Sequence, residues 1–490
     1  MAKQLNILFV SSEVDPFAKT GGLADVCSAL PHMVKEMGQE VRVMMPRYGS
    51  ISDRKFMIHN VIRLKEIPIP VGKEEKLTSI NSSFIATIKT KVQVYFLSNK
   101  EYFNRDGLYA SNKTHVDFKD NDERFIFFCR GVLETLKRLG WQPDIIHCND
   151  WQTGLIPAYM KTIYANDPFY KNIKTIFTIH NLAYQGNFPE STLAKTGLPK
   201  ELYNDDGVKF KNQFSFIKAG IAFADMVTTV SDQYAKEISS SKEFGYGFEE
   251  FIKKKKINLT GILNGINYNV WNPEIDPLIS KRFNSKSIEG KLGNKIEVLE
   301  RFGLESNYNV PLFGMISRLV PLKGIELIEK IADKFLKHDV RFVILGSGEK
   351  KYQSIFEKLQ KKYKNKVGFI NAFDEELAHL VEAGCDVYLM PSECEPCGLN
   401  QMYSLRYGTI PIVRSTGGLD DTIRDVKKPN GTGFKFEKFD ANELLVSIER
   451  ALKLYKNKTQ WQKIMRNGMS ENLSWEASAK KYISLYRKLI

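Results

Sequence analysis

Cysteine is scarce in this chain of 490 residues, with six in all. So few cysteines exclude a disulfide framework as the expected basis of the fold. Cys394 and Cys397 have the CxxC spacing of a zinc or redox site. A structural zinc site needs a second such pair, which the sequence lacks. A redox role for the pair stays open.

Long hydrophobic runs are also missing. No stretch of about 18 apolar residues occurs, so no membrane-spanning helix is expected. The short apolar run at residues 5–10 is soon followed by Glu13, Asp15 and Lys19. It lacks the longer apolar region and the cleavage site of a signal peptide. We therefore expect a cytoplasmic protein with no membrane partner.

Several catalytic motifs are absent, among them the P-loop, HExxH and the Gly-x-Ser-x-Gly elbow. Residues 346–348 (GSG) lack the third glycine and the acidic partner of a dinucleotide fingerprint, which leaves a nicotinamide-dependent oxidoreductase unsupported. Residues 120–122 (DND) resemble a metal-binding DxD motif. They precede a helical pattern, where helix capping is the expected role. We expect neither a cofactor nor a metal.

Charge of one sign is in excess but is not concentrated. Lys and Arg number 71 and Asp and Glu 57, for a formal net charge of +14. Such a balance suits nucleic acid, an anionic membrane surface or a phosphorylated small ligand. The lysines are dispersed, and the short run at residues 253–256 accompanies no nucleic-acid-binding motif. We expect no nucleic-acid partner.

Short apolar segments alternate with helical patterns along most of the chain. The strand candidates of the first half are residues 5–10, 41–45, 92–97, 144–147, 175–179 and 226–230. Those of the second half are residues 312–316, 341–345, 367–371, 386–390 and 410–413. Strands separated by helices predict parallel sheets, and the chain is too long for one core. The sequence therefore predicts an α/β fold with two doubly wound, Rossmann-like domains.

The domain boundary is expected just after the lysine run, where a turn-rich segment follows. We assign residues 1–256 to an N-terminal domain and residues 257–471 to a C-terminal domain. The chain from Ser474 onward has a helical pattern that can pack back on the first domain. Residues 472–490 are therefore assigned to the N-terminal domain.

One phrase occurs near both ends of the chain, as TGGLAD at residues 20–25 and TGGLDD at residues 416–421. Each copy precedes a helical pattern. Glycines let backbone approach a ligand closely, and a helix N-terminus attracts phosphate. Ligands of doubly wound sheets bind at the carboxyl ends of the strands, so two facing domains would each contribute one such loop. Ordinary helix-start chemistry is the alternative.

Charged side chains also follow predicted strands. Arg318 and Lys323 come after residues 312–316 and could clamp a diphosphate, whose charge grows during transfer. Glu395 follows residues 386–390, where a carboxylate can accept hydrogen bonds from sugar hydroxyls. A surface loop, or a helix cap for Glu395, is the simpler interpretation of each taken alone.

The first half has two comparable loops, which place Asp150, Trp151, His180 and Asn181 at strand ends. A lone histidine is more often a satisfied core residue, but His180 and Asn181 lie together at a strand end. Lys19 lies just before a helix N-terminus, which suits a phosphate contact. These positions favour a polar site at one edge of the first sheet.

Six segments together resemble a known family: KTGGLADV, HNLAYQG, GILNGINYNVWNP, SRLVPLKG, PSECEPCGL and RSTGGLDDT. In content and order they are similar to bacterial glycogen synthases and plant starch synthases, glycosyltransferase family 5. The resemblance spans nearly the whole chain. It implies the GT-B fold, two Rossmann-like domains facing across a deep cleft. It also implies retaining transfer of glucose from ADP-glucose to the non-reducing 4-OH end of an α-1,4-glucan such as glycogen.

The resemblance implies roles for residues of the first domain. Contacts to the phosphates or sugar of the donor should come from Lys19, Gly21 and Gly22, with Asp25 in the same motif. His180 and Asp150 should line the catalytic centre, with Asn181 nearby.

It implies roles in the second domain as well. Arg318 and Lys323 should bind the diphosphate, while Glu395 should hold the glucose. Phe373 falls where an aromatic residue packs on the nucleotide base. Backbone N–H groups for the phosphate should come from Thr416, Gly417 and Gly418.

The chain departs from its relatives at two places. The second Glu that related glycosyltransferases carry eight residues after the first is Tyr403 here, which fits this family's variant. The loop at Asp150 reads CNDWQT, where relatives often carry His beside Asp and Trp. Acceptor contacts there stay open, as do the base and ribose contacts around Phe373 and Asp374.

Retention of configuration usually requires a carboxylate nucleophile opposite the leaving group. No clear one is evident in the sequence, which favours front-face attack, with the departing phosphate helping to deprotonate the acceptor hydroxyl. A UDP-glucose-dependent transferase and a non-catalytic glucan-binding protein remain alternatives. The oligomeric state is not predicted.

Overall fold

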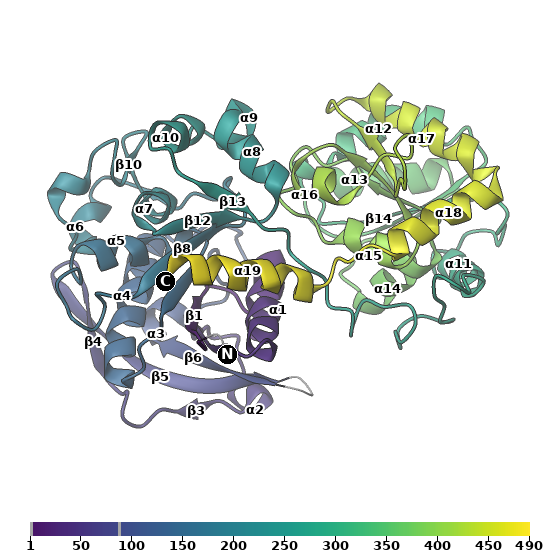
Figure 1. Cartoon of the computed structure of the whole chain (residues 1–490). Helices are drawn as coiled ribbons and strands as arrows, with labels where there is room; N and C mark the ends of the chain where they lie inside the picture. Colours follow the sequence, from purple (N-terminus) through teal and green to yellow (C-terminus); the bar gives the residue numbers. More distant parts are fainter. Residues whose placement is uncertain (1–2, 87–89) are drawn as a thin grey trace. The chain divides into compact units, whose positions relative to one another are not determined.

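The computed structural model describes residues 3–86 and 90–490, which form two compact units (Figure 1). The first unit contains the chain up to Val230, then Ala235–Ile262 and Trp475–Ile490. The second contains Ser231–Tyr234 and Leu263–Ser474. The main crossing thus follows residue 262 where the sequence suggests 256, and the chain returns at residue 475 where the sequence suggests 472.

The first unit is built around a sheet with parallel strands in the order β13–β12–β8–β7–β1–β2–β6. Their bounds are β1 Asn6–Val10, β2 Glu40–Pro46, β6 Lys91–Ser98, β7 Ile145–Asn149, β8 Lys174–Ile179, β12 Met226–Thr229 and β13 Leu259–Gly261. Every residue of β7 is buried, as expected for a parallel strand that helices cover on both faces. The six strand candidates of the first half are confirmed.

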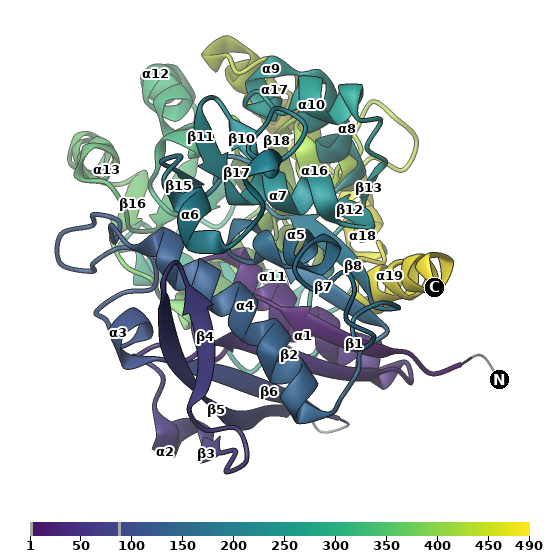
Figure 2. The same cartoon turned by 90° about the vertical axis from the view of Figure 1, so that its left-hand side faces the viewer.

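An antiparallel extension at the β6 edge was not predicted. Our strand candidates include none between residues 45 and 92, whereas this region holds β3 (His59–Asn60), β4 (Ile67–Val71) and β5 (Glu74–Ala86). β5 pairs antiparallel with β6, and β4 pairs antiparallel with β5 (Figure 2). A small separate sheet contains β9 (Asn187–Phe188), β10 (Lys209–Phe210) and β11 (Gln213–Ser215).

Helices cover the first sheet, and two of them are widely separated in sequence. α1 buries Val26, Leu30 and Val34, one apolar stripe at helical spacing. α19 lies along α1 (Figure 1), so the helical pattern predicted from Ser474 onward corresponds to a helix of the first unit. The bounds are α1 Gly22–Glu36, α2 Asp53–Phe56, α3 Lys100–Phe103, α4 Asn121–Leu139, α5 Leu155–Lys161, α6 Thr192–Thr196, α7 Phe216–Phe223, α8 Asp232–Ser240, α9 Lys242–Gly245, α10 Glu249–Lys254 and α19 Trp475–Leu489.

The second unit has a parallel sheet in the order β16–β15–β14–β17–β18–β19, the 3-2-1-4-5-6 arrangement of a Rossmann fold. The strands are β14 Leu312–Ile316, β15 Arg341–Leu345, β16 Val367–Ile370, β17 Val387–Met390, β18 Ile410–Arg414 and β19 Phe434–Phe436. The helices are α11 Gly290–Arg301, α12 Ile325–Phe335, α13 Lys350–Lys362, α14 Glu375–Gly384, α15 Asn400–Arg406, α16 Gly417–Thr422, α17 Ala441–Tyr455 and α18 Lys458–Met469. The five strand candidates of the second half are confirmed.

Each sheet has a point where the strand order reverses. In the first unit β1 lies between β2 and β7, and in the second unit β14 lies between β15 and β17. Loops that leave the carboxyl ends of strands diverge at such a point and open a crevice. The loops after β1 and β7, and those after β14 and β17, are therefore the expected ligand-binding loops of each unit.

The DND segment at residues 120–122 does not cap a helix as expected. Asp120 precedes α4, but its side chain makes no capping hydrogen bond and instead pairs with Arg105. Asp122 accepts hydrogen bonds from Thr192 and Lys195, which ties α4 to α6.

Among the described residues, no helix has the length and apolar character needed to cross a membrane.

Candidate active site

The loop between β1 and α1 is held by an acidic residue that the sequence did not single out. Glu13 is 3% exposed, and its Oε1 accepts hydrogen bonds from Thr20 Oγ1 at 2.6 Å and Tyr109 OH at 2.7 Å. Its Oε2 accepts from the backbone N–H of Gly21 at 3.3 Å. Charge-assisted bonds of this kind are strong, so Glu13 fixes the conformation of the first TGGL loop.

Lys19 and Asp25 lie at the two ends of the same loop. Lys19 Nζ is 2.6 Å from Asp25 Oδ1, and both side chains are partly exposed. Burial raises the pKa of the Asp25 carboxyl, and the Lys19 ammonium opposes that rise. A partly exposed pair contributes little stability, so the Lys19 ammonium can exchange Asp25 for an anionic ligand at small cost.

The two TGGL copies have different surroundings. A Cβ atom added at Gly21 or Gly22 would have nothing within 4 Å, so the first loop leaves open space above its backbone. At Gly417 a Cβ would lie 2.2 Å from the Glu395 carbonyl oxygen, and at Gly418 2.0 Å from that of Cys397. Gly417 also has a positive φ of 44°. The second copy is therefore required by internal packing against the Glu395 loop.

This contrast predicts opposite effects of the same substitution. Gly418→Ala should lower the free energy of unfolding by more than about 2 kcal/mol, because the clash is with backbone that cannot move freely. Gly22→Ala, at the first position of α1, should leave stability unchanged or slightly higher. Denaturant unfolding of both variants measures the difference. Equal loss of stability in the two variants would contradict the distinction.

Two of the three backbone N–H groups of the second copy that were expected to face a phosphate donate hydrogen bonds within the protein. Thr416 N–H donates to the Arg414 carbonyl at 3.0 Å, and Gly418 N–H donates to the carbonyls of Glu395 and Pro396, each at 3.1 Å. The expected phosphate contacts of Thr416, Gly417 and Gly418 stay predictions. The Gly418 N–H group holds the Glu395 loop in place.

Asp150 follows β7 in a strained backbone conformation. Its φ of 57° and ψ of 178° lie in a region that glycine occupies almost alone. The conformation is held from both sides, because Asp150 N–H donates to the Thr178 carbonyl at 3.0 Å and Asp150 Oδ1 accepts from His180 N–H at 2.7 Å. Strain of this kind costs stability and concentrates at functional sites.

His180 follows β8 and lies beside β7. Its Nε2 is 2.9 Å from Asn149 Oδ1, and Asn149 is itself buried at the end of β7. Burial lowers the pKa of the His180 imidazole to about 3, so the ring is neutral near pH 7. Asn181 follows, and its Oδ1 accepts from Ala183 N–H at 3.0 Å. The structure therefore brings Asp150 and His180 into one hydrogen-bonded group.

Burial raises the pKa of the Asp150 carboxyl to about 7, although N–H groups of His180 and Asn181 donate to it. Its ordinary value is 3.8. Between about pH 4 and pH 7 the folded protein holds a proton that the unfolded chain has released, so the free energy of unfolding falls as pH rises through that window. The fall attributable to Asp150 is up to about 4 kcal/mol. Asp150→Asn should remove this part of the pH dependence.

Denaturant unfolding of the wild type and Asp150→Asn at several pH values between 4 and 8 checks this prediction. Asp205→Asn is the matched control, because it removes an exposed carboxylate from the same unit. Parallel stability curves for the wild type and Asp150→Asn would contradict the assigned shift.

In the second unit, Lys323 and Glu395 meet. Lys323 Nζ is 2.6 Å from Glu395 Oε2, which also accepts from Ser392 Oγ at 3.1 Å. The two loops come together because Gly324 has no side chain; a Cβ there would lie 2.0 Å from the Pro391 carbonyl oxygen. Lys323, which is expected to bind the diphosphate, and Glu395, which is expected to bind glucose, thus form an ion pair.

Arg318 and Phe373 are exposed. The Arg318 guanidinium makes no hydrogen bond or ion pair with other described residues. Phe373, between β16 and α14, is 89% exposed, an unusual environment for a large aromatic ring without a ligand. Asp374 Oδ1 accepts from Leu377 N–H and caps α14. The expected roles of Arg318 and Phe373 stay predictions.

The GSG segment has a packing role. A Cβ at Gly346 would lie 2.0 Å from the Ser317 carbonyl oxygen, and one at Gly348 would lie 2.3 Å from that of Leu319. These glycines let the loops after β14 and β15 pack together beside Arg318.

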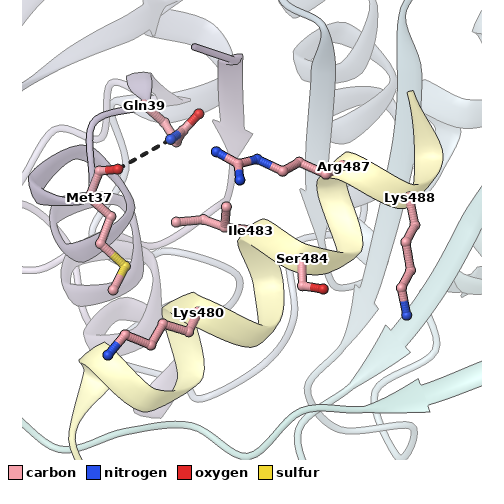
Figure 3. A pocket seen from close by; sticks show the side chains of 7 residues that line it. All are labelled: Met37, Gln39, Lys480, Ile483, Ser484, Arg487 and Lys488. Atoms are coloured by element: carbon pink, nitrogen blue, oxygen red, sulfur yellow. Dashed lines mark hydrogen bonds between the residues drawn. The ribbon is translucent and has the colours of Figure 1, made fainter. Parts of the chain in front are cut away.

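A pocket with a volume of about 520 Å³ lies in the first unit between the end of α1 and α19 (Figure 3). None of the predicted site residues lines it. Its location is at the amino-terminal start of β2, away from the strand ends that carry Asp150 and His180. Its lining residues are Met37, Gln39, Lys480, Ile483, Ser484, Arg487 and Lys488.

Within residues 3–86 and 90–490, no three His, Cys, Asp or Glu side chains are grouped to hold a metal ion.

Known families match both halves of this arrangement. Residues 6–254 match the starch synthase catalytic domain, and residues 299–468 match the glycosyl transferases group 1 family. The chain is 41% identical to a glycogen synthase of Syntrophotalea carbinolica, with 99% of each chain covered. It is 43% identical to a glycogen synthase of Desulforudis audaxviator, covering 99% of this chain and 96% of that relative.

Two solved structures resemble the fold of this chain. The catalytic domain of starch synthase IV from Arabidopsis thaliana, bound to ADP and acarbose, superposes with a TM-score of 0.90 at 32% identity and covers 99% of each chain. A sucrose-phosphate synthase from Thermosynechococcus elongatus shares the fold alone, with a TM-score of 0.61 at 18% identity over 99% of each chain.

Two Rossmann-like units with charged loops at their strand-order reversals define a glycosyltransferase of the GT-B class. The chain belongs to the glycogen synthase and starch synthase family.

Proposed function

We propose that this protein transfers glucose from ADP-glucose to the non-reducing 4-OH end of an α-1,4-glucan, with retention of configuration, in glycogen synthesis. The observation that carries the proposal is the Lys323–Glu395 pair at the strand-order reversal of the second unit. Family membership over the whole chain supports it. An ammonium group that can bind a diphosphate, held against a carboxylate that can bind a sugar, suits a nucleotide-sugar ligand better than a neutral glucan alone.

The second unit is proposed to bind the donor. An ammonium group has three donors, and one Lys323 donor is used by Glu395, which leaves two for diphosphate oxygens. Arg318 supplies a second cation. Phe373 offers an exposed aromatic face for the nucleotide base. Adenine is proposed because the starch synthase IV structure that this chain resembles was bound to ADP.

The first unit is proposed to contribute the polar groups around the reacting sugar. Lys19, Gly21 and Gly22 form an open loop that a phosphate or sugar can approach. Asp150, His180 and Asn181 are proposed to contact substrate hydroxyls. Asp25 is proposed to hold Lys19 until the donor arrives.

For the chemical step we propose front-face attack. Glu395 is occupied by Lys323, and Asp150 is buried with a raised pKa and is bonded to His180 N–H. Both are poor nucleophiles in these settings. The departing diphosphate therefore accepts the proton of the acceptor hydroxyl, while Lys323 and Arg318 stabilise its growing charge. Detection of a glucosyl ester on Asp150 or Glu395 would contradict this step.

We also propose a cytoplasmic location, because the few cysteines of the chain form no disulfide framework, as is usual in a reducing compartment.

Competition between ADP-glucose and UDP-glucose, supplied together with glycogen as acceptor, tests the donor assignment. We expect incorporation mainly from ADP-glucose. Preferential use of UDP-glucose would overturn the base assignment while keeping the reaction class. Glycogen binding without transfer from either donor would favour a non-catalytic glucan-binding protein.

A further inference from the structure

Asn149 is the last residue of β7, and its side chain connects three strands of the first sheet. Its Nδ2 donates to the Val10 carbonyl at 3.1 Å and to the His147 carbonyl at 3.2 Å. Its Oδ1 faces His180 Nε2 at 2.9 Å. Asn149 is 2% exposed, so water does not compete for these bonds.

The orientation of this amide is fixed by its partners. The two backbone carbonyls can only accept hydrogen bonds, so the end of the amide that faces them must be the NH₂ group. A flipped amide would place its oxygen against two carbonyl oxygens, and none of these three atoms can donate a hydrogen bond. The oxygen of Asn149 must therefore be the atom that faces His180.

The orientation of Asn149 in turn determines the protonation of His180. An amide oxygen can only accept, so His180 Nε2 must carry the hydrogen. In a neutral imidazole the other nitrogen is then an acceptor. His180 Nδ1 makes no hydrogen bond to any other residue in the described part of the chain.

We propose that Asn149 is a positioning residue that holds His180 in the Nε2–H tautomer, so that Nδ1 accepts a hydrogen bond from a substrate hydroxyl group. The identity of that hydroxyl as part of a glucosyl donor or glucan acceptor rests on the proposed function. The tautomer itself does not, because it follows from contacts within the protein.

His147, a fully buried histidine of β7, shows why this inference is specific. His147 Nδ1 is 2.8 Å from Tyr486 OH, and its Nε2 is 2.6 Å from Thr178 Oγ1. Both partners are hydroxyls, which can donate or accept, so geometry does not select a tautomer of His147. Only an acceptor with a fixed orientation, as at Asn149, does so.

Long-range nitrogen–proton NMR correlation on the full-length protein, labelled with ¹⁵N-histidine, tests the tautomer directly. His180 signals are assigned from their loss in His180→Gln, or from contacts to the Asn149 amide if that variant fails to fold. We expect His180 Nε2 to be protonated and Nδ1 to be unprotonated at neutral pH. A protonated Nδ1 would overturn the proposal whether or not the protein transfers glucose.

Kinetics of Asn149→Leu test the functional part. The variant should show mixed His180 tautomers and a kcat/KM lower by about tenfold or more, the effect of one lost substrate hydrogen bond. Thr228→Val is the matched control, because it breaks the buried Thr178–Thr228 hydroxyl pair in the same sheet without touching His180. It should keep the tautomer and kcat/KM.

The outcomes separate the two proposals. Unchanged kcat/KM in Asn149→Leu with mixed tautomers would show that the tautomer has no role in the reaction. An Nε2–H tautomer in a protein that transfers no glucose would leave the positioning role of Asn149 intact and contradict only the proposed activity.

Discussion

Glu395→Ala is expected to lower kcat by about 10²–10³-fold, the usual effect of removing one preorganised electrostatic group. Glu395 is 9% exposed, and its Oε2 is bonded to Lys323 and Ser392. Its Oε1 has no hydrogen-bond partner among the described residues, which leaves it for a sugar hydroxyl or a cationic sugar carbon. Steady-state kinetics with the donor and glycogen measure the loss.

Glu393→Ala is the matched control, because it removes a carboxylate from the same loop two residues earlier. It should retain nearly normal turnover. Thermal unfolding of Glu395→Ala should resemble that of the wild type, since Lys323 remains partly exposed and its charge can be hydrated. A Glu395→Ala enzyme with near-normal kcat would remove Glu395 from the mechanism.

Lys323→Ala should also lower kcat by about 10²–10³-fold, with a smaller effect on KM. The reason is that the leaving diphosphate carries more charge in the transition state than in the bound donor, so Lys323 stabilises the transition state more. Lys323→Arg should recover part of the loss, because the charge is kept while the geometry changes. Initial rates across donor concentrations separate the two constants.

Lys435→Ala controls for the loss of a partly buried ion pair. Lys435 pairs with Asp420 in the same unit, and its side chain is 15% exposed, against 20% for Lys323. Its replacement should change stability rather than kcat. If Lys323→Ala raised KM alone, Lys323 would bind the donor without contributing to the chemical step.

The parallel strands could be predicted because each is a short apolar run between helical patterns. The β4–β5 hairpin could not, since Pro68 and Pro70 interrupt the apolar pattern of β4 and are typical of edge strands. β4 tolerates them because it pairs with β5 alone in the sheet. Its alternating burial becomes interpretable only once that partner is known.

The choice of candidate site residues could be made from the sequence because they follow predicted strands, and loops at strand ends carry function in doubly wound sheets. The hydrogen bonds that connect these residues could not be predicted. Glu13 bonds to Tyr109, 96 residues away, and Asn149 to His180, 31 residues away. The one available signal for Glu13 was a carboxylate soon after a buried strand. The two TGGL copies differ in their surroundings because of packing between loops, and this packing cannot be predicted from two identical sequences.

The measurement that tests the central claim most directly is incubation with ADP-glucose and a maltooligosaccharide of defined length. Mass spectrometry counts the glucose units added, and proton NMR identifies the new linkage. The proposed function predicts products lengthened by single glucose units through α-1,4 bonds, with loss of elongation in Glu395→Ala. No elongation from ADP-glucose, or a β-linked product, would contradict it.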